Sequence, residues 1–173
     1  PIHVSRNIRD YPHMRFILAN GLQPGTIPNC DVIIASLFIE HLDKPLDFLL
    51  DIKSLCSKLI IEVPNFDSYT RKKFGEHWAG YHTPRHTALY SPNNIEILLK
   101  NSGWQVEKIL TYGTLDPYTL HWMSEMERKG IDWSSSMESR FIGFVAGMII
   151  HKPIYMWQKH ISMGFLTIIA KPV

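Results

Sequence analysis

The sequence predicts an open α/β sheet, mostly parallel, with helices on both of its faces. The apolar run at 31–36 is continuous rather than alternating, which is typical of a strand buried on both faces, and 59–63 is a further predicted strand. Between them, 45–55 carries its apolar residues at helical spacing. A strand, a helix and a second strand over this distance form a crossover unit, and such a unit joins parallel strands.

Boundary residues define the elements of this first part of the chain. Residues 16–19 are typical of a short buried strand, which an Asn20-Gly21 turn closes. A loop containing two prolines covers 22–30. Pro45 can open the helix, and Pro64-Asn65 stops the strand at 59–63. The order predicted so far is strand, loop, strand, helix, strand.

The second part adds a helix, a strand, a helical stretch and a last strand. Ser91-Pro92 is a helix start, with serine as the N-cap and proline in the first turn, and Gly103 ends that helix. Residues 105–112 alternate in polarity and predict a half-exposed strand. We expect 117–160 to be mostly helical, and 165–170 to form the closing strand.

Length and composition indicate one globular domain. The chain has 173 residues, of which 45% are hydrophobic and 20% charged. A net charge of +2, with scattered basic residues, argues against a nucleic-acid partner. The two cysteines, Cys30 and Cys56, have no metal-like spacing, so neither a zinc site nor a disulfide framework is expected. A reducing, cytoplasmic setting is the simplest expectation.

The most apolar stretch is 141–150, and His151, Lys152 and Pro153 end it. About ten residues is half of what a membrane-spanning helix requires, so we expect no transmembrane span. A buried helix is the favoured interpretation. The alternative is a helix that faces lipid or a partner, with peripheral membrane contact through 141–157.

Four segments, taken in order, resemble the class I S-adenosylmethionine-dependent methyltransferases, in the broad group that includes ubiquinone and natural-product methyltransferases. The segments are 31–45, 59–65, 78–92 and 98–104. They are similar to the family's fourth strand with its Glu-His continuation, its fifth strand, the loop and helix start that follow, and the turn before its sixth strand. The closing strand is similar to the antiparallel seventh strand. The resemblance implies a Rossmann-like sheet with 117–160 as a helical insertion or lid before its last strand.

One part of the family's pattern has no counterpart here. The glycine-rich turn after the first strand and the acidic residue that ends the second strand are both missing. By the resemblance, 16–19 would be strand three, so strands three to seven are present and the first two are not. The chain opens at Pro1 with no complete element before Tyr11. We therefore expect 1–173 to be a single partial, N-terminally truncated methyltransferase domain that is inactive by itself.

The resemblance also implies S-adenosylmethionine as cofactor and assigns its contacts. Asn20 and Gly21 would lie near the adenine, although Asn-Gly is also ordinary turn chemistry. Ser36 and Leu37 would offer backbone carbonyls to the cofactor's amino group. His41 would line the cleft beside them.

Histidines are the candidate general bases, since histidine titrates near neutrality. We rank them His82, His86 and His41. Glu40 precedes His41 and could fix its tautomer, whereas a purely positional pair is the alternative. A metal site formed by His77, His82 and His86 is not expected, because Gly80 and Pro84 argue against the helix that their spacing would require.

The candidate substrate contacts lie after the strand at 59–63. Asn65 could orient an acceptor, or could simply be a turn residue after proline. Trp78, Tyr81 and Arg85 could provide a stacking wall and an anion clamp. The alternative is a loop pinned by Trp78 and Pro84, with Arg85 and His86 bonded to backbone carbonyls.

The function implied is transfer of a methyl group from S-adenosylmethionine to the O, C or N atom of a small-molecule acceptor. The sulfonium carries its own activation, so the protein mainly supplies proximity and a water-poor site. Two alternatives remain open. One is a non-catalytic methyltransferase-like binding or scaffold module without its cofactor half. The other is a different nucleotide-cofactor α/β enzyme. The sequence identifies neither the acceptor nor the oligomeric state.

Overall fold

The computed structural model describes residues 13–14, 27–131 and 140–173. The predicted strand at 16–19 and its Asn20-Gly21 turn lie outside these residues. The elements follow one another in this order: β1 (Cys30–Ser36), η1 (Ile39–His41), α2 (Pro45–Ile52), β2 (Cys56–Pro64), α3 (Tyr69–Phe74), η2 (Gly75–His77), η3 (Ala79–Tyr81), α4 (Pro92–Asn101), β3 (Trp104–Leu110), α5 (Pro117–Arg128), α6 (Phe141–Tyr155) and β4 (Phe165–Pro172).

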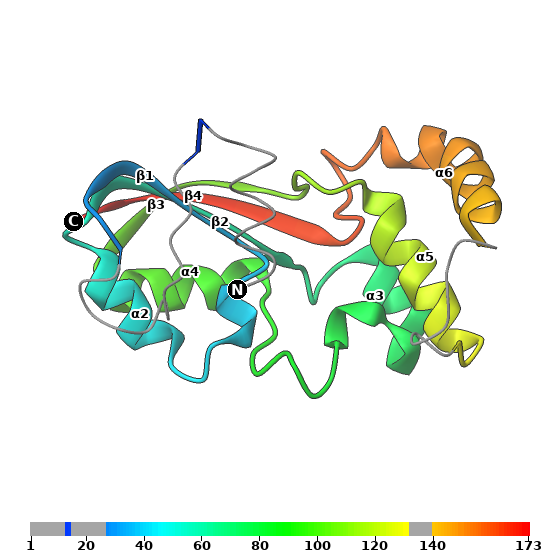
Figure 1. Ribbon diagram of the computed structural model, residues 1–173, viewed down its shortest axis with the longest axis horizontal. Helices are drawn as coiled ribbons and strands as arrows, with labels where there is room; N and C mark the ends of the chain where they lie inside the picture. Colours follow the sequence, from blue (N-terminus) through cyan, green and yellow to red (C-terminus); the bar gives the residue numbers. More distant parts are fainter. Residues whose placement is uncertain (1–12, 15–26, 132–139) are drawn as a thin grey trace.

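The four described strands form one sheet in the order β1-β2-β4-β3 (Figure 1). β1 and β2 are parallel, with Ile33 opposite Leu59, and α2 lies in the connection between them. β4 enters between β2 and β3 and is antiparallel to both. Three strands therefore share one direction and β4 opposes them. This confirms the predicted open, mostly parallel sheet with an antiparallel closing strand.

One face of the sheet carries the main hydrophobic core. Leu59, Ile61 and Val63 of β2 are fully buried. Helices α2 and α4 contact each other and pack on this face. They contribute the buried side chains Phe48, Leu49, Ile52, Ile95 and Leu99. Burying each side chain of this kind stabilises the fold by about 1.5–3 kcal/mol relative to exposure.

The opposite face of β1 departs from the prediction. Val32 and Ile34 alternate with the residues that face the core, and they are 42% and 67% exposed. Since α2 and α4 share the other face, helices do not cover both faces of the sheet within the described residues. The continuous apolar run of β1 is thus buried on one side and exposed on the other.

The start and end of α4 follow the predicted signals. Ser91 Oγ accepts a hydrogen bond from the Asn94 backbone N–H, and Asn94 Oδ1 accepts one from the Ser91 N–H. This reciprocal pair satisfies two backbone donors that the first turn of a helix leaves free. Gly103 follows the helix with φ +77°, a conformation that side chains disfavour.

Helices α3, α5 and α6 gather beyond the end of the sheet where β1 and β2 finish (Figure 1). α5 contacts α3, η2, η3 and α6. The helices α5 and α6 agree with the mostly helical character predicted for 117–160. Their role as an insertion or lid stays a prediction.

Helix α6 differs from the buried helix that the sequence favoured. It extends beyond the apolar stretch through Pro153 to Tyr155, and Tyr155 is its one buried residue. It packs towards α5 with Phe144 and Met148, while Ile142 and Ile150 are exposed. The reason is that α5 covers only one side of a helix that is apolar all round. None of the described helices is long and apolar enough to cross a membrane.

A buried glutamate ties the sheet to the segment that enters α5. Glu62 of β2 is 2% exposed, and its carboxylate accepts hydrogen bonds from Thr114 N–H (2.6 Å), Thr114 Oγ1 (2.7 Å) and Ser36 Oγ (3.2 Å). Leu115 N–H donates a longer bond of 3.4 Å. A side chain at Gly113 would collide with this carboxylate. Glu62 therefore fixes the path of the chain between β3 and α5.

We expect Glu62→Gln to lower the free energy of unfolding by about 1.5–3 kcal/mol, because an amide NH₂ would replace an oxygen that now accepts from several donors. Urea unfolding of the two proteins measures this. Glu107→Gln is the matched control. Glu107 pairs with Lys58 and Lys171 at 3.5 and 3.6 Å on the surface, where loss of such pairs costs at most about 1 kcal/mol. Equal effects of the two substitutions would contradict the anchoring role of Glu62.

Candidate functional site

A pocket of about 220 Å³ opens where β1 and β2 end. Ligands of open α/β sheets bind beyond the carboxyl ends of the parallel strands, and this pocket has that position. Its polar and charged lining residues are Glu40, His41, His82, Arg85, His86 and Thr119. Apolar side chains form the rest of the wall, chiefly Leu37, Leu115, Leu120, Met123 and Phe165.

The first wall is built by the turn from β1 into η1. Leu37 has φ +49°, which is unusual for a residue with a side chain and is found mostly where surrounding structure enforces it. Its N–H donates to Glu62 O at 2.9 Å, so the turn is held against β2. The chain then forms η1, which places Glu40 and His41 at the pocket.

The second wall is the loop after α3, and buried contacts fix it. Trp78 is 2% exposed and its indole N–H donates to Thr70 Oγ1 at 3.2 Å. The Ala79 N–H donates to Ser124 Oγ of α5 at 3.0 Å. Farther along, Thr87 donates from its N–H to Glu40 O at 2.8 Å and from Oγ1 to Leu42 O at 2.8 Å. These last bonds hold the loop against η1.

As a result, the three histidines ranked from the sequence come together. The ring centroids of His41 and His86 lie 4.7 Å apart, those of His82 and His86 5.2 Å, and those of His41 and His82 6.4 Å.

Partial burial, with the nearby Arg85 cation, lowers the pKa of His82. Burial likewise lowers the pKa of His86. Both imidazoles are therefore neutral near pH 7, which is the form that can accept a proton.

Backbone carbonyls fix the orientation of two of these rings. His41 Nδ1 lies 3.0 Å from Arg85 O, and His86 Nδ1 lies 2.8 Å from Gly80 O. A carbonyl oxygen can only accept, so in each ring Nδ1 carries the hydrogen and donates it. In the neutral rings the lone pair is then on Nε2. For His86 this is the backbone-bonded arrangement that the sequence left open.

Glu40 is the unusual member of the pocket wall. It is 1% exposed, and neither carboxylate oxygen has a hydrogen-bond partner among the described residues. Burial, only partly offset by the neighbouring His41, raises the pKa of this carboxyl. Buried carboxylates are nearly always paired, so an unpaired one beside a pocket calls for a ligand or a proton.

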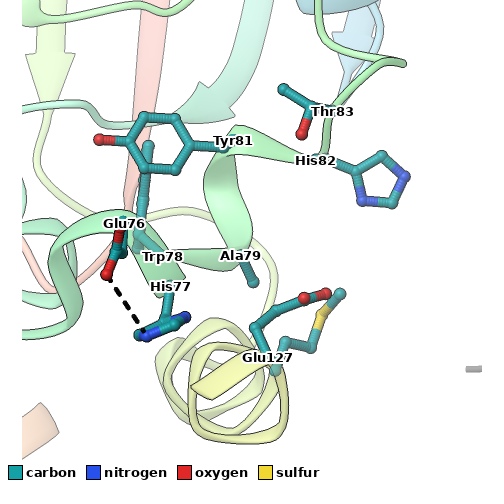
Figure 2. A pocket seen from close by; sticks show the side chains of 9 residues that line it. Glu76, His77, Trp78, Ala79, Tyr81, His82, Thr83 and Glu127 are labelled. Atoms are coloured by element: carbon teal, nitrogen blue, oxygen red, sulfur yellow. Dashed lines mark ion pairs between the residues drawn. The ribbon is translucent and has the colours of Figure 1, made fainter. Parts of the chain in front are cut away.

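A second, larger cavity of about 410 Å³ lies on the other side of the same loop. Figure 2 shows the Tyr81 and His82 side chains projecting to different sides of the loop, with Glu127 across the cavity from them. His77 and Glu76 form an ion pair of 3.8 Å at its rim. Trp78 and Tyr81, two of the predicted substrate contacts, line this cavity and not the pocket at the strand ends. His82 lines both.

The remaining predicted site residues have different surroundings. Arg85 lines the pocket at the strand ends. Ser36 is exposed and its hydroxyl donates to Glu62. Asn65 is buried with both ends of its amide in use, since Nδ2 donates to Ser162 Oγ at 2.7 Å and Oδ1 accepts from the Asp67 N–H at 3.0 Å. Asn20 and Gly21 lie outside the described residues.

The structure also reveals a buried histidine that the sequence did not single out. His121 of α5 lies with Nδ1 2.7 Å from Tyr155 Oη and Nε2 3.3 Å from Lys73 Nζ. A lysine ammonium can only donate, so Nε2 is the acceptor and Nδ1 carries the ring hydrogen towards Tyr155. Burial, with the Lys73 charge, lowers the pKa of His121 to about 4. Through these two contacts, His121 of α5 connects α5 to α3 and to α6. The position of His121 in the helical pattern of the sequence did not indicate either contact.

This low pKa predicts a defined pH dependence of stability. The unfolded chain takes up a proton at His121 near pH 6.5, whereas the folded protein resists protonation until about pH 4. The contribution of His121 to the free energy of unfolding is therefore complete above about pH 6.5. As the pH falls towards 4, the free energy of unfolding decreases by about 2–3 kcal/mol through this group. His121→Gln should flatten that part of the unfolding free energy against pH, measured by urea titrations from pH 7.5 to 4.5. The same substitution at the exposed His160 should leave the slope unchanged, and an unaltered slope in His121→Gln would refute the assignment.

Three solved structures are similar to this chain in fold. An S-adenosylmethionine-dependent methyltransferase from Archaeoglobus fulgidus has 22% identity and a TM-score of 0.51, with 90% of this chain and 66% of that one covered. The [4+2]-cyclase SpnF has 14% identity and a TM-score of 0.56, with 98% and 61% covered. LaPhzM has 14% identity and a TM-score of 0.53, with 99% and 39% covered. The chain thus spans less than two thirds of the length of each. No curated protein matches the chain.

A family model described as a methyltransferase domain matches residues 7–109, which is more than half of the chain. The open, mixed α/β sheet of this chain is consistent with its similarity in fold to these structures. The chain therefore belongs to the methyltransferase domain family and has the Rossmann-like fold of the class I S-adenosylmethionine-dependent methyltransferases.

Proposed function

We propose that this protein transfers a methyl group from S-adenosylmethionine to a small-molecule acceptor that binds in the pocket at the ends of β1 and β2. The observation that carries the proposal is the meeting of His41, His82 and His86 at this pocket. The proposal includes a cytoplasmic location for the protein.

The described residues fit one side of a cofactor site. At the end of β1 the strained turn at Leu37 leaves Ser36 exposed and Leu37 on the pocket wall. The backbone carbonyls of these two residues would hold the amino acid end of the cofactor, with His41 lining the cleft beside it, and Asn20 and Gly21 would contact its adenine. When bound, the cofactor supplies a methyl group that is already activated by the sulfonium.

The chain's own residues then have three tasks. Leu115, Leu120 and Phe165 exclude water from the reacting atoms. His82 accepts the proton that an oxygen or carbon acceptor loses as its bond to the methyl carbon forms and the carbon–sulfur bond breaks. Arg85 holds an anionic group of the acceptor. Trp78, Tyr81 and Asn65 do not line this pocket, so they have no direct contact with the acceptor in this proposal.

A second candidate is a methyltransferase-like binding or scaffold module without catalysis. The absence of a glycine-rich turn from these 173 residues favours it. A nucleotide-cofactor enzyme of another kind is a further candidate, and the similarity to a [4+2]-cyclase supports the point that this fold serves more than one reaction.

Calorimetric titration with S-adenosylhomocysteine tests the cofactor assignment. The full-length protein that contains this chain should bind it at one site, and this chain alone should bind it far more weakly. NADH is the control ligand, and it should not bind. Binding by neither protein would support the scaffold module, whereas binding of NADH in place of S-adenosylhomocysteine would support a different nucleotide-cofactor enzyme.

Substitution of His82 tests the base. We expect His82→Asn in the full-length protein to lower the turnover number by about 10²–10⁴, the usual contribution of a general base, with S-adenosylhomocysteine affinity unchanged. Release of S-adenosylhomocysteine, measured with a panel of phenols, carboxylic acids and amines as acceptors, gives the rate. His160→Asn, an exposed histidine beyond α6, is the control. Full turnover of His82→Asn would remove His82 from the reaction.

A further inference from the structure

We propose that Glu40, His41 and His86 form a binding site for one divalent transition-metal ion on the wall of the pocket at the strand ends. This departs from the sequence-based expectation, which included no metal and considered only His77, His82 and His86. The site rests on its own geometry and does not require the proposed methyl transfer.

The first argument is convergence. One carboxylate oxygen of Glu40 and one ring nitrogen each of His41 and His86 lie within 4.8 Å of one another. The residues come from two separate segments, η1 and the loop before α4. The bonds of Thr87 to Glu40 O and Leu42 O hold the two segments together, so the cluster is part of the fold and not a chance approach of surface side chains.

The second argument is the orientation of the imidazoles. His41 and His86 each direct Nδ1 at a backbone carbonyl, at 3.0 and 2.8 Å. Histidines that bind metals nearly always donate their other ring N–H to a carbonyl or carboxylate, because this fixes the tautomer and ring direction. Both rings therefore have the outer hydrogen bond of a metal ligand, with Nε2 left to coordinate.

The third argument is Glu40, whose buried carboxylate lacks any hydrogen-bond partner among the described residues. Glu62, by contrast, is equally buried and has donors on both of its oxygens. Glu62 is therefore fully satisfied, whereas the carboxylate of Glu40 in η1 has no partner among the described residues, and the proposed ion would supply one. A divalent cation is the partner that two neutral imidazoles would share with it.

The donor set defines the class of ion. Two imidazoles and one carboxylate are the ligands of catalytic zinc sites and of non-haem iron(II) sites, and both types keep open positions. Magnesium and calcium prefer oxygen donors only. Bonds of about 2.1 Å in a tetrahedral site separate the ligand atoms by about 3.4 Å, so the cluster would close by about 1.4 Å at most. Side-chain rotation provides a movement of this size.

The open positions of such an ion would face the pocket that Glu40, His41 and His86 line. There it would act as a Lewis acid on an oxygen of a bound acceptor. His82 is not a member of the cluster, and it stays available as the base. The proposed roles of His82 and Arg85 are therefore the same whether or not an ion is bound.

Metal titration of the untagged, metal-stripped full-length protein tests the site. Calorimetry with ZnCl₂ should show one ion per chain, and CoCl₂ should give visible absorption bands of a nitrogen- and oxygen-ligated ion. Glu40→Gln and His86→Asn should each weaken binding by more than the roughly 10–100-fold that loss of an outer-shell partner causes. His160→Asn should bind as the wild type does. Equal affinity of all four proteins, or no binding to the wild type, would overturn the proposal.

Thermal unfolding provides a readout that does not depend on activity. Without metal, Glu40→Gln should raise the melting temperature, because it removes a buried carboxylate without partners. With ZnCl₂ the order should reverse, since only the wild type gains stability from the ion. A melting temperature of wild type that ZnCl₂ does not raise would also overturn the site. Because S-adenosylhomocysteine affinity is measured separately, the metal site and the proposed methyl transfer can fail independently.

Discussion

The pairing of β2 on both of its edges is the constraint on which the rest of the described structure depends. Its backbone bonds β1 in parallel on one side and β4 in antiparallel on the other, and its inward side chains are fully buried. A one-residue shift of β2 would turn its whole buried set outwards, so the register is strongly specified. That register places Glu62 beneath the segment that enters α5, and Pro64 at the pocket. The position of the first wall, the turn after β1, therefore follows from this strand, whereas the loop after α3 is held by its own contacts with α5 and η1.

Two buried glutamates near this end of the sheet, Glu62 and Glu40, differ in the hydrogen-bond partners of their carboxylates. Glu62 is surrounded by donors and holds the chain between β3 and α5 in place. Glu40 lines a pocket, and its carboxylate has no hydrogen-bond donor in the part of the chain that the structure describes; nearby, Leu37 has an unfavourable backbone angle. Unpaired buried charge and backbone strain are both destabilising, and proteins retain them chiefly at functional sites. Their coincidence here, next to three histidines, is why the pocket at the strand ends, and not the larger cavity beside Tyr81, is the favoured site.

Sequence periodicity was sufficient to predict the strands and the start of α4, because burial and capping leave local signals such as Ser91-Pro92. It also proposed His41 and His86 separately, from two segments. It did not predict that their rings meet, since 45 positions separate them and the contact depends on the bonds of Thr87 to η1. The exposure of α6 was missed because an all-apolar helix does not reveal how many neighbours it has. His121 was missed for the related reason that a histidine on a helix looks the same from sequence whether it is buried or exposed.

The size of the pocket limits what it can hold. About 220 Å³ is below the roughly 300–1,000 Å³ of sites that enclose a drug-sized ligand. Under the proposed function, the described walls would surround the reacting atoms and the nearest part of an acceptor, because the pocket is too small for a nucleoside cofactor together with a complete substrate. A fold shared at 14% identity with a [4+2]-cyclase does not define the chemistry. Under the proposed function, specificity would come from the few polar groups that line the pocket, namely the three histidines, Arg85 and Glu40.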